Sequence, residues 1–198
     1  MIAIIDYRMG NLRSVENALT RCGAEYVVTS DPDVIKAADK VILPGVGNAG
    51  EAMQNLREFG LDKLIPTLRK PVLGICVGMQ VMCRYTEEGD AKCMGLFDVD
   101  VRKFEASPEL KVPHMGWNSV EFSKPRNPLF KELGEQPYFY FVHSYHCVPE
   151  DQSIITAVAE YGEKLTAAVA KDNIMATQFH PEKSGDVGLQ VLKNFIEL

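Results

Sequence analysis

The sequence predicts an α/β fold, with a three-layer, flavodoxin-like, mostly parallel sheet, helices on both faces and antiparallel strands added in the second half. Short apolar runs alternate with amphipathic stretches over the first 82 residues, as in a parallel sheet covered on both faces. After residue 96 most of the signals are those of strands, so we expect antiparallel additions. With 198 residues, 46% of them hydrophobic, the chain can form one domain with a substantial core, expected to span residues 1–198.

In the first half of the sequence, predicted strands and helices alternate regularly. An apolar run at the start predicts a strand, and the helical spacing of Leu12, Val15 and Leu19 predicts a helix that Gly23 ends. Similar runs place strands at residues 2–5, 26–29, 40–43 and 71–75, and helices at 12–22, 33–38, 49–59, 61–68 and 79–82. Because ligand sites in such sheets lie at the carboxyl ends of strands, the loop after residue 43 and the turn at Cys76 are candidate site positions.

The second half is richer in strands. Alternating or β-rich segments predict strands at residues 97–102, 117–122, 138–145, 154–161 and 174–179. The last of these strands leads directly to His180. We expect Ser184 to cap a final helix whose residues Leu189, Leu192 and Ile196 face inward.

Composition and charge exclude several classes of protein, such as nucleic-acid-binding and membrane proteins, from the expected functions. The net charge is −6 and there is no basic block, so nucleic acid is not an expected partner. The first residues lack a basic segment, and no apolar run reaches transmembrane length, so no membrane association is expected. The five cysteines are odd in number and irregular in spacing, which argues against a disulfide framework and favours the cytoplasm.

No metal or other cofactor is expected. His143, His146 and Cys147 are metal-ligand residue types, but residues three apart in a strand point to opposite faces. No Cys-x-x-Cys pair supports a zinc site either.

Cys76 is the strongest candidate for a catalytic residue. It lies between Gly74 and Gly78, after an apolar strand and before a helical segment. The same strand–turn–helix arrangement holds the serine of the G-x-S-x-G nucleophile elbow. The start of the helix favours a thiolate and a developing oxyanion. The alternative is a cysteine that serves only as a small core residue, although a core strand does not require the two glycines.

A base and a carboxylate follow about a hundred residues later. His180 is separated by one residue from Glu182, which gives the nucleophile, base and orienting acid that cysteine-based acyl transfer requires. His180 could instead be a surface histidine and Glu182 a solvated charge. The catalytic interpretation therefore depends on whether the fold brings both strand ends to one edge of the sheet.

These motifs carry a family resemblance. Residues 74–80 (GICVGMQ) and 180–182 (HPE) resemble those of the class I, triad-type glutamine amidotransferases. Several further segments resemble the glutaminase subunits of imidazole glycerol phosphate synthases, namely residues 5–7 (IDY), 9–15 (MGNLRSV), 44–47 (PGVG), 113–118 (PHMGWN), 141–145 (FVHSY) and 179–184 (FHPEKS). Two residues depart from the family pattern. Arg8 stands where the family often has a small residue, and Val77 stands where leucine is usual.

The resemblance implies hydrolysis of glutamine to glutamate and ammonia, with Cys76 as nucleophile, His180 as proton carrier and Glu182 as orienting acid. It implies an oxyanion hole made of backbone N–H groups, with Val77, Val46 and Gly47 as candidates. The residues that it implies for glutamine binding are Gly45, Gln80, Glu88, His143, Ser144 and Tyr145.

The resemblance also implies a partner, the (β/α)8-barrel cyclase subunit, in a heterodimer that makes imidazole glycerol phosphate for histidine biosynthesis. Trp117, Tyr140 and Lys183 are candidates for the interface, with burial of Trp117 in the core as the alternative. Three other functions stay open. One is a glutaminase that serves another synthase, such as pyridoxal phosphate synthase, and the second is a non-enzymatic docking relative. The third is a cysteine protease or thiol stress protein on a related fold.

Overall fold

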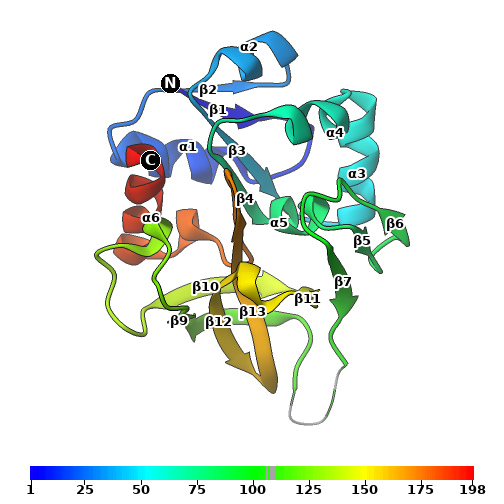
Figure 1. Ribbon diagram of the computed structural model, residues 1–198, viewed down its shortest axis with the longest axis vertical. Coiled ribbons are helices and arrows are strands. Elements are labelled where there is room, and N and C mark those ends of the chain that lie inside the picture. The colour runs from blue at the N-terminus through cyan, green and yellow to red at the C-terminus, as the bar shows by residue number, and fades with distance from the viewer. Residues whose placement is uncertain (106, 108–109) are drawn as a thin grey trace.

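The computed structural model describes residues 1–105, 107 and 110–198 and confirms the three-layer α/β architecture (Figure 1). In the part of the chain that is described, the main sheet has eight strands in the order β2-β1-β3-β4-β14-β13-β12-β9. The first five, β2 (Tyr26–Thr29), β1 (Ile2–Ile5), β3 (Lys40–Gly45), β4 (Val72–Cys76) and β14 (Ile174–Thr177), pair in parallel. This 2-1-3-4-5 order is the flavodoxin-like one that the sequence predicts.

Helices cover both faces of this parallel part. Helices α1 (Leu12–Arg21) and α6 (Gly185–Glu197) pack together on one side, and α3 (Ala49–Glu58), α4 (Leu61–Leu64) and α5 (Val77–Met82) lie on the other (Figure 1). A short helix, α2 (Pro32–Ala37), precedes β3. Side chains cap three of these helices as their residue types favour, because Asn11, Asp31 and Asn48 accept hydrogen bonds from backbone N–H groups in the first turn.

The strands of the second half extend the sheet and form two smaller ones. Strands β13 (Glu163–Lys171), β12 (Ile155–Tyr161) and β9 (Glu121–Phe122) continue the main sheet with antiparallel pairing. Strands β8 (His114–Ser119) and β10 (Tyr138–His143) form a two-stranded sheet. A four-stranded sheet contains β11 (Tyr145–Pro149), β7 (Val99–Lys103), β5 (Tyr85–Thr86) and β6 (Ala91–Lys92).

Two strand predictions need correction, and one strand of the main sheet was not predicted. The expected strand at 117–122 is divided at Val120, where the chain leaves its pairing with β10 and joins β12. The expected strand at 138–145 is divided at Ser144, because β10 pairs with β8 and β11 pairs with β7. Strand β13 was not predicted, since its Ala-rich sequence lacks a clear β pattern and it is fixed by its neighbours β12 and β14.

Ser184 lies at the N-terminal cap of α6, but its side chain does not make the predicted capping hydrogen bond. Its hydroxyl donates to the carbonyl oxygen of His180 at 2.6 Å and accepts from the N–H of Tyr140 at 3.0 Å. Ser184 therefore ties the segment after β14 to strand β10 instead of completing the helix.

Glycines bring helix α5 into direct contact with the sheet. A Cβ at Gly78 would lie 2.0 Å from the carbonyl oxygen of Leu43 in β3, and one at Gly74 would lie 2.8 Å from the Met82 sulfur. A Cβ at Gly45 would lie 2.7 Å from the backbone nitrogen of Gly78. The glycines on both sides of Cys76 thus allow the close packing predicted for the turn.

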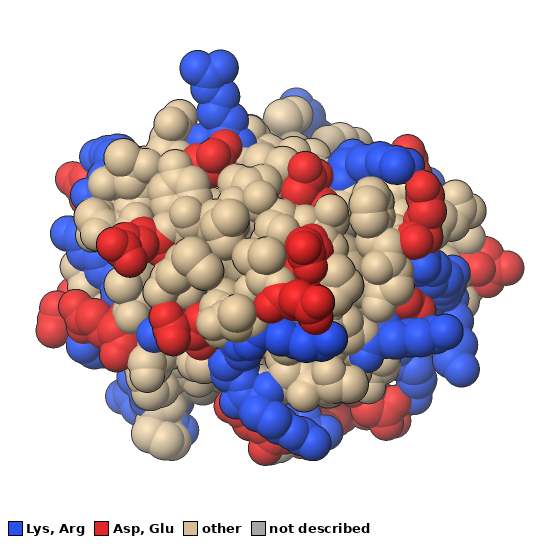
Figure 2. Space-filling model, turned by 90° about the horizontal axis from the view of Figure 1, so that it is seen from above, with Lys and Arg blue, Asp and Glu red and all other residues tan. Residues whose placement is uncertain are grey.

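Charged side chains of both signs are distributed over the surface. On the face shown in Figure 2, acidic and basic residues are interspersed around a large uncharged area. Among the described residues, no helix has both the length and the apolar character needed to cross a membrane.

Replacement of Gly78 by alanine is expected to destabilise the protein by about 3 kcal/mol, because the added methyl group overlaps a backbone oxygen that cannot move aside. The control is Gly134→Ala, where nothing lies within 4 Å of the added Cβ. Urea unfolding of both variants measures the difference. An equal unfolding free energy for the two would contradict the close approach of α5 and β3.

Candidate active site

The fold brings the ends of three parallel strands to one edge. Strand β4 ends at Cys76, its neighbour β3 ends at Gly45, and its other neighbour β14 is followed by Gln178, Phe179 and His180. A cavity of about 640 Å³ opens there, and Cys76 and His180 both line it. The spatial condition for the catalytic interpretation of these two residues is therefore met.

The backbone at Cys76 is strained. The φ of Cys76 is 54°, in the left-handed region, which is unfavourable for a residue with a Cβ. Cys76 occupies the N-terminal cap position of α5. The thiol lies 3.9 Å from the carbonyl oxygen of Val142 and 3.7 Å from the side-chain nitrogen of Gln178. The turn thus directs the sulfur toward the strand ends instead of into the sheet.

His180 and Glu182 form a buried pair. His180 Nδ1 lies 2.7 Å from Glu182 Oε1, and the two side chains are 1% and 2% exposed. Burial disfavours the charged imidazolium, but the negative charges of Cys76 and Glu182 outweigh burial and raise the pKa of His180 to about 10. No described residue offers His180 Nε2 a hydrogen bond of ordinary geometry, although the sulfur is close enough to influence its charge. This arrangement can hold a proton next to a bound substrate.

The predicted oxyanion residues lie around the same cavity. Val46, Gly47 and Val77 all line it, and Gly47 has a φ of 89°. The hydroxyl of Tyr7 donates to the carbonyl oxygen of Pro44 at 2.8 Å and so fixes the start of this loop. Gly45 is not among the residues that line the cavity, so the glutamine contact expected for it stays a prediction. It is buried beneath α5, where the close packing leaves no room for a side chain.

Two predicted glutamine-binding side chains are partly engaged within the protein. Gln80 lines the cavity, but its amide nitrogen donates to the carbonyl oxygen of Tyr145 at 3.0 Å and to Gln178 Oε1 at 3.2 Å. Both of its amide hydrogens are thereby used, which leaves its oxygen to offer a ligand. Glu88 lines the cavity and accepts the N–H of Ala49 at 2.7 Å, while burial raises the pKa of its carboxyl group.

His143, Ser144 and Tyr145 form one wall of the cavity. The carbonyl oxygen of Ser144 accepts from the N–H of Phe104 at 3.1 Å, and that of Tyr145 accepts from Gln80 and from His143 Nδ1 at 2.8 Å. These two carbonyl groups are therefore engaged in holding the wall together.

Several residues of the site were not among the predicted ones. Gly10, Asn11, Pro113 and Val142 also line the cavity, and the side-chain nitrogen of Gln178 lies 3.7 Å from the Cys76 sulfur. The position of Gln178, two residues before His180 at the end of an apolar strand, was the one sequence signal for its role.

A buried histidine pair was also missed. His114 Nδ1 lies 2.9 Å from His143 Nε2, and Asn118 Nδ2 lies 3.3 Å from His114 Nε2. Burial lowers the pKa of His143 to about 3 and that of His114 to about 4. Both histidines are therefore neutral at physiological pH.

The residues predicted for a partner interface lie beside the site. Trp117 is 56% exposed, so the alternative of core burial is wrong, and its ring meets that of Tyr140 edge to face at 6.2 Å. The carbonyl oxygen of Tyr140 accepts the N–H of His180 at 2.9 Å, and Lys183 lines the cavity. Met115 and Tyr138 add further exposed apolar surface to the same two strands.

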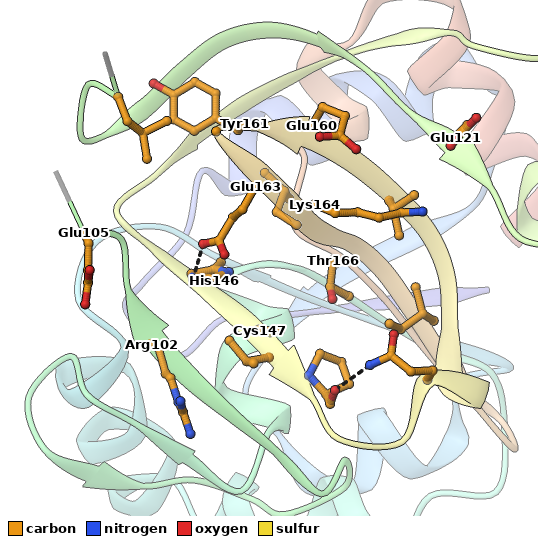
Figure 3. Close-up of a pocket in the computed structure, with 18 of the residues that line it drawn as sticks. Arg102, Glu105, Glu121, His146, Cys147, Glu160, Tyr161, Glu163, Lys164 and Thr166 are labelled. Atoms are coloured by element: carbon orange, nitrogen blue, oxygen red, sulfur yellow. Dashed lines mark hydrogen bonds and ion pairs between the residues drawn. The ribbon is translucent and has the colours of Figure 1, made fainter. Parts of the chain in front are cut away.

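A larger cavity, of about 1100 Å³, lies between β7, β11 and the β12–β13 hairpin (Figure 3). Its lining includes two basic residues, Arg102 and Lys164, and three acidic ones, Glu105, Glu160 and Glu163. Glu163 Oε1 lies 3.7 Å from His146 Nε2. Cys76 and His180 are not among its lining residues. The chemistry of the strand-end cavity therefore does not extend into it.

Comparison with known proteins identifies the family. The family model for "Glutamine amidotransferase class-I" matches residues 3–198. The chain belongs to the class-I glutamine amidotransferase family.

Individual members of the amidotransferase family are similar over their whole length. The chain is 52% identical over 198 residues to the imidazole glycerol phosphate synthase subunit HisH of Bacteroides fragilis, covering all of this chain and 99% of that one. It is 46% identical over 199 residues to the subunit of the same name from Acinetobacter baylyi, covering 99% and 97% of the two chains.

A solved structure supports the fold assignment. PurLQS from Thermotoga maritima superposes with a TM-score of 0.73 at 19% identity, over 99% of this chain and 97% of that one. At this identity the likeness shows the fold alone, and it agrees with the three-layer architecture.

The buried histidine pair predicts a loss of stability in acid. Both pKa values are lowered from 6.5, so the stabilisation by the neutral rings is complete above about pH 6.5 and is lost as the pH falls toward 4 and then 3. At pH 5 each ring is expected to contribute a loss on the order of 2 kcal/mol.

Urea unfolding at pH 7 and pH 5 measures this loss. Asparagine cannot be protonated in this range, so His114→Asn should show a smaller loss between the two pH values than the wild type. The same loss in both proteins would show that His114 is not held neutral by the fold.

Proposed function

We propose that this chain is the glutaminase subunit of an imidazole glycerol phosphate synthase, which hydrolyses L-glutamine and passes the ammonia to a synthase partner. The observation that carries the proposal is that Cys76 and His180 meet in one cavity, with Glu182 bound to His180 at 2.7 Å. The curated relatives, which bear this subunit's name and match the chain from end to end, support the choice of synthase.

In the proposed reaction the Cys76 sulfur attacks the side-chain amide carbon of glutamine. The negatively charged oxygen of the resulting tetrahedral intermediate would accept hydrogen bonds from the backbone N–H of Val77 and from backbone N–H groups of the loop that contains Val46 and Gly47. His180, held as an imidazolium by its neighbours, gives a proton to the departing nitrogen, and ammonia leaves. His180 then takes a proton from water, whose oxygen attacks the thioester carbon. Collapse of this second tetrahedral intermediate releases glutamate and a proton and leaves the Cys76 thiolate beside the His180 imidazolium. Glu182 orients the ring throughout.

Substrate contacts are assigned to the remaining cavity residues. Gln80 Oε1 and the Glu88 carboxylate, which both line the cavity, would meet the α-amino group of glutamine, which is a cation. The wall formed by His143, Ser144 and Tyr145 limits the length of the substrate. Gly45 serves packing in this proposal, because its lack of a side chain lets α5 lie close to β3. No metal or cofactor takes part in these steps.

The partner is proposed to be a (β/α)8-barrel cyclase subunit that docks on the exposed apolar face of β8 and β10. Trp117, Tyr140 and Lys183 would lie in that interface, together with Met115 and Tyr138. Because Tyr140 bonds directly to the backbone of His180, this face adjoins the cavity and would allow ammonia to pass without entering bulk water. We further infer a single domain over residues 1–198 and a cytoplasmic location.

Replacement of Cys76 by alanine is expected to abolish glutamine hydrolysis, since no other group can form the thioester. In the complex with the cyclase, synthase activity supported by added ammonium salt should remain. Cys22→Ala is the matched control, because the Cys22 thiol lies outside the cavity. Glutamate release by the Cys76 variant near the wild-type rate would exclude Cys76 as nucleophile.

Trp117→Ala is expected to weaken binding of the cyclase subunit by about thirtyfold, corresponding to about 2 kcal/mol for an aromatic hot spot. Leu198→Ala removes another exposed apolar side chain, at the C-terminus, and should leave binding unchanged. Titration calorimetry with the purified partner compares the two. Unaltered affinity of the Trp117 variant would place the interface elsewhere.

A further inference from the structure

A continuous series of hydrogen bonds runs beside the cavity wall. It begins at Asn118 on β8, passes through His114 and His143, and ends at the carbonyl oxygen of Tyr145 on β11. Asn118 is also bonded to the carbonyl oxygen of Glu160 at 2.8 Å. Both ends of the series are thus backbone carbonyl groups, which can only accept hydrogen bonds.

These two carbonyl groups determine where every proton lies. His143 Nδ1 faces the oxygen of Tyr145 and must carry a hydrogen, so that in the neutral ring Nε2 is an acceptor. His114 Nδ1 must then donate to His143, which leaves His114 Nε2 as an acceptor. Asn118 supplies one amide hydrogen to that nitrogen and the other to Glu160. Both histidines are therefore fixed as the Nδ1–H tautomer.

An additional proton does not fit this arrangement. A hydrogen on His114 Nε2 would face the amide group of Asn118, and a hydrogen on His143 Nε2 would face the Nδ1–H of His114. Among the described residues, the titratable groups around His143 are His114, His146 and His180, none of which is an anion, and the ring of Tyr161 stacks on that of His114 at 3.9 Å. Burial and the surrounding groups act in the same direction as the hydrogen-bond geometry.

The series continues to the nucleophile through two glutamines. The Tyr145 carbonyl oxygen also accepts from Gln80, whose amide nitrogen is shared with Gln178 Oε1. Since the oxygen of Gln178 is turned toward Gln80, its nitrogen is the atom that faces the Cys76 sulfur at 3.7 Å. The position of the Tyr145 carbonyl group therefore affects which group the sulfur meets.

We propose that His114 and Asn118 are positioning residues for glutamine hydrolysis. They fix His143 as the Nδ1–H tautomer, and His143 in that form holds the Tyr145 carbonyl group where Gln80 and Gln178 direct an N–H group at Cys76. The effect on catalysis rests on the function proposed above, whereas the tautomers themselves do not.

Nitrogen-15 NMR of the histidine rings in the full-length wild-type chain tests the first half of this proposal. At pH 7 the rings of His114 and His143 should both give the signals of the neutral Nδ1–H form, and they should remain neutral at pH 6. Assignment uses His114→Asn, which removes one set of signals. An Nε2–H tautomer or an imidazolium in either ring at pH 7 would overturn the proposal.

Two substitutions at His114 test the second half in the complex with the cyclase. Phenylalanine keeps a ring next to Phe141 and Tyr161 but cannot donate, and His114→Phe should lower kcat for glutamine hydrolysis at least tenfold, with a smaller change in KM. Asparagine offers an N–H close to the position of Nδ1, and His114→Asn should recover most of that loss. Tyr161→Phe, which removes only the hydrogen bond to the Lys111 carbonyl oxygen, is the control and should match the wild type.

Equal losses in His114→Phe and His114→Asn, or no loss in either, would overturn the positioning role. If His114→Phe does not fold, the tautomers of the wild type and the rate of His114→Asn still decide the question. A wild-type complex that releases no glutamate would instead contradict the proposed function, while the tautomer measurement would retain its meaning.

Discussion

The close approach of helix α5 to strand β3 is the constraint on which the rest of the site depends. Gly78 lies against the carbonyl oxygen of Leu43, and Gly45 lies against the backbone of Gly78, so that neither position has room for a Cβ. The chain can begin α5 at this short distance only by turning sharply at Cys76, with its φ of 54°. This strained conformation costs on the order of 1–3 kcal/mol, and the packing of strand β4, which is buried along its whole length, and of its neighbour β3 offsets that cost.

The site places histidines in two opposite electrostatic environments within one small region. His180 contacts a buried carboxylate and a sulfur that can be negatively charged, and its pKa is raised. Among the described residues, His143 has no anionic neighbour. It is bonded to a carbonyl group and to another histidine, and its pKa is lowered. A positively charged ring, His180, and a neutral ring, His143, therefore lie around the same cavity. The charge suits His180 to proton transfer, and neutrality suits His143 to supporting the wall.

Much of the fold could be predicted because its parallel part is encoded locally. Apolar runs of strand length, capping residues such as Asp31 and the glycines around Cys76 each indicate their own structure. The errors occur where pairing between distant segments decides the outcome. Val120 and Ser144 look like strand residues, and the chain changes sheets at them because β12 and β7 lie nearby.

The same distinction applies to the site. Cys76, His180 and Glu182 could be proposed from their motifs, since each motif holds its chemistry within a few residues. The series from Asn118 to Tyr145 could not, because β8, β10 and β11 come together only in the folded chain. The buried position of Gly45 was also hidden, since a glycine after a strand is compatible with either a ligand contact or close packing.

The most direct test of the account is the site at which a reactive analogue of glutamine modifies the protein. A diazoketone analogue, which alkylates a nucleophile held against the side-chain carbon, would be added to the full-length chain with its cyclase partner, with and without excess glutamine. Peptide mass mapping should find one equivalent of label, on Cys76 and not on the other four cysteines, and glutamine should protect against it. Label on a different residue, or label on Cys76 that glutamine does not prevent, would contradict the claim that the strained turn presents this sulfur to glutamine.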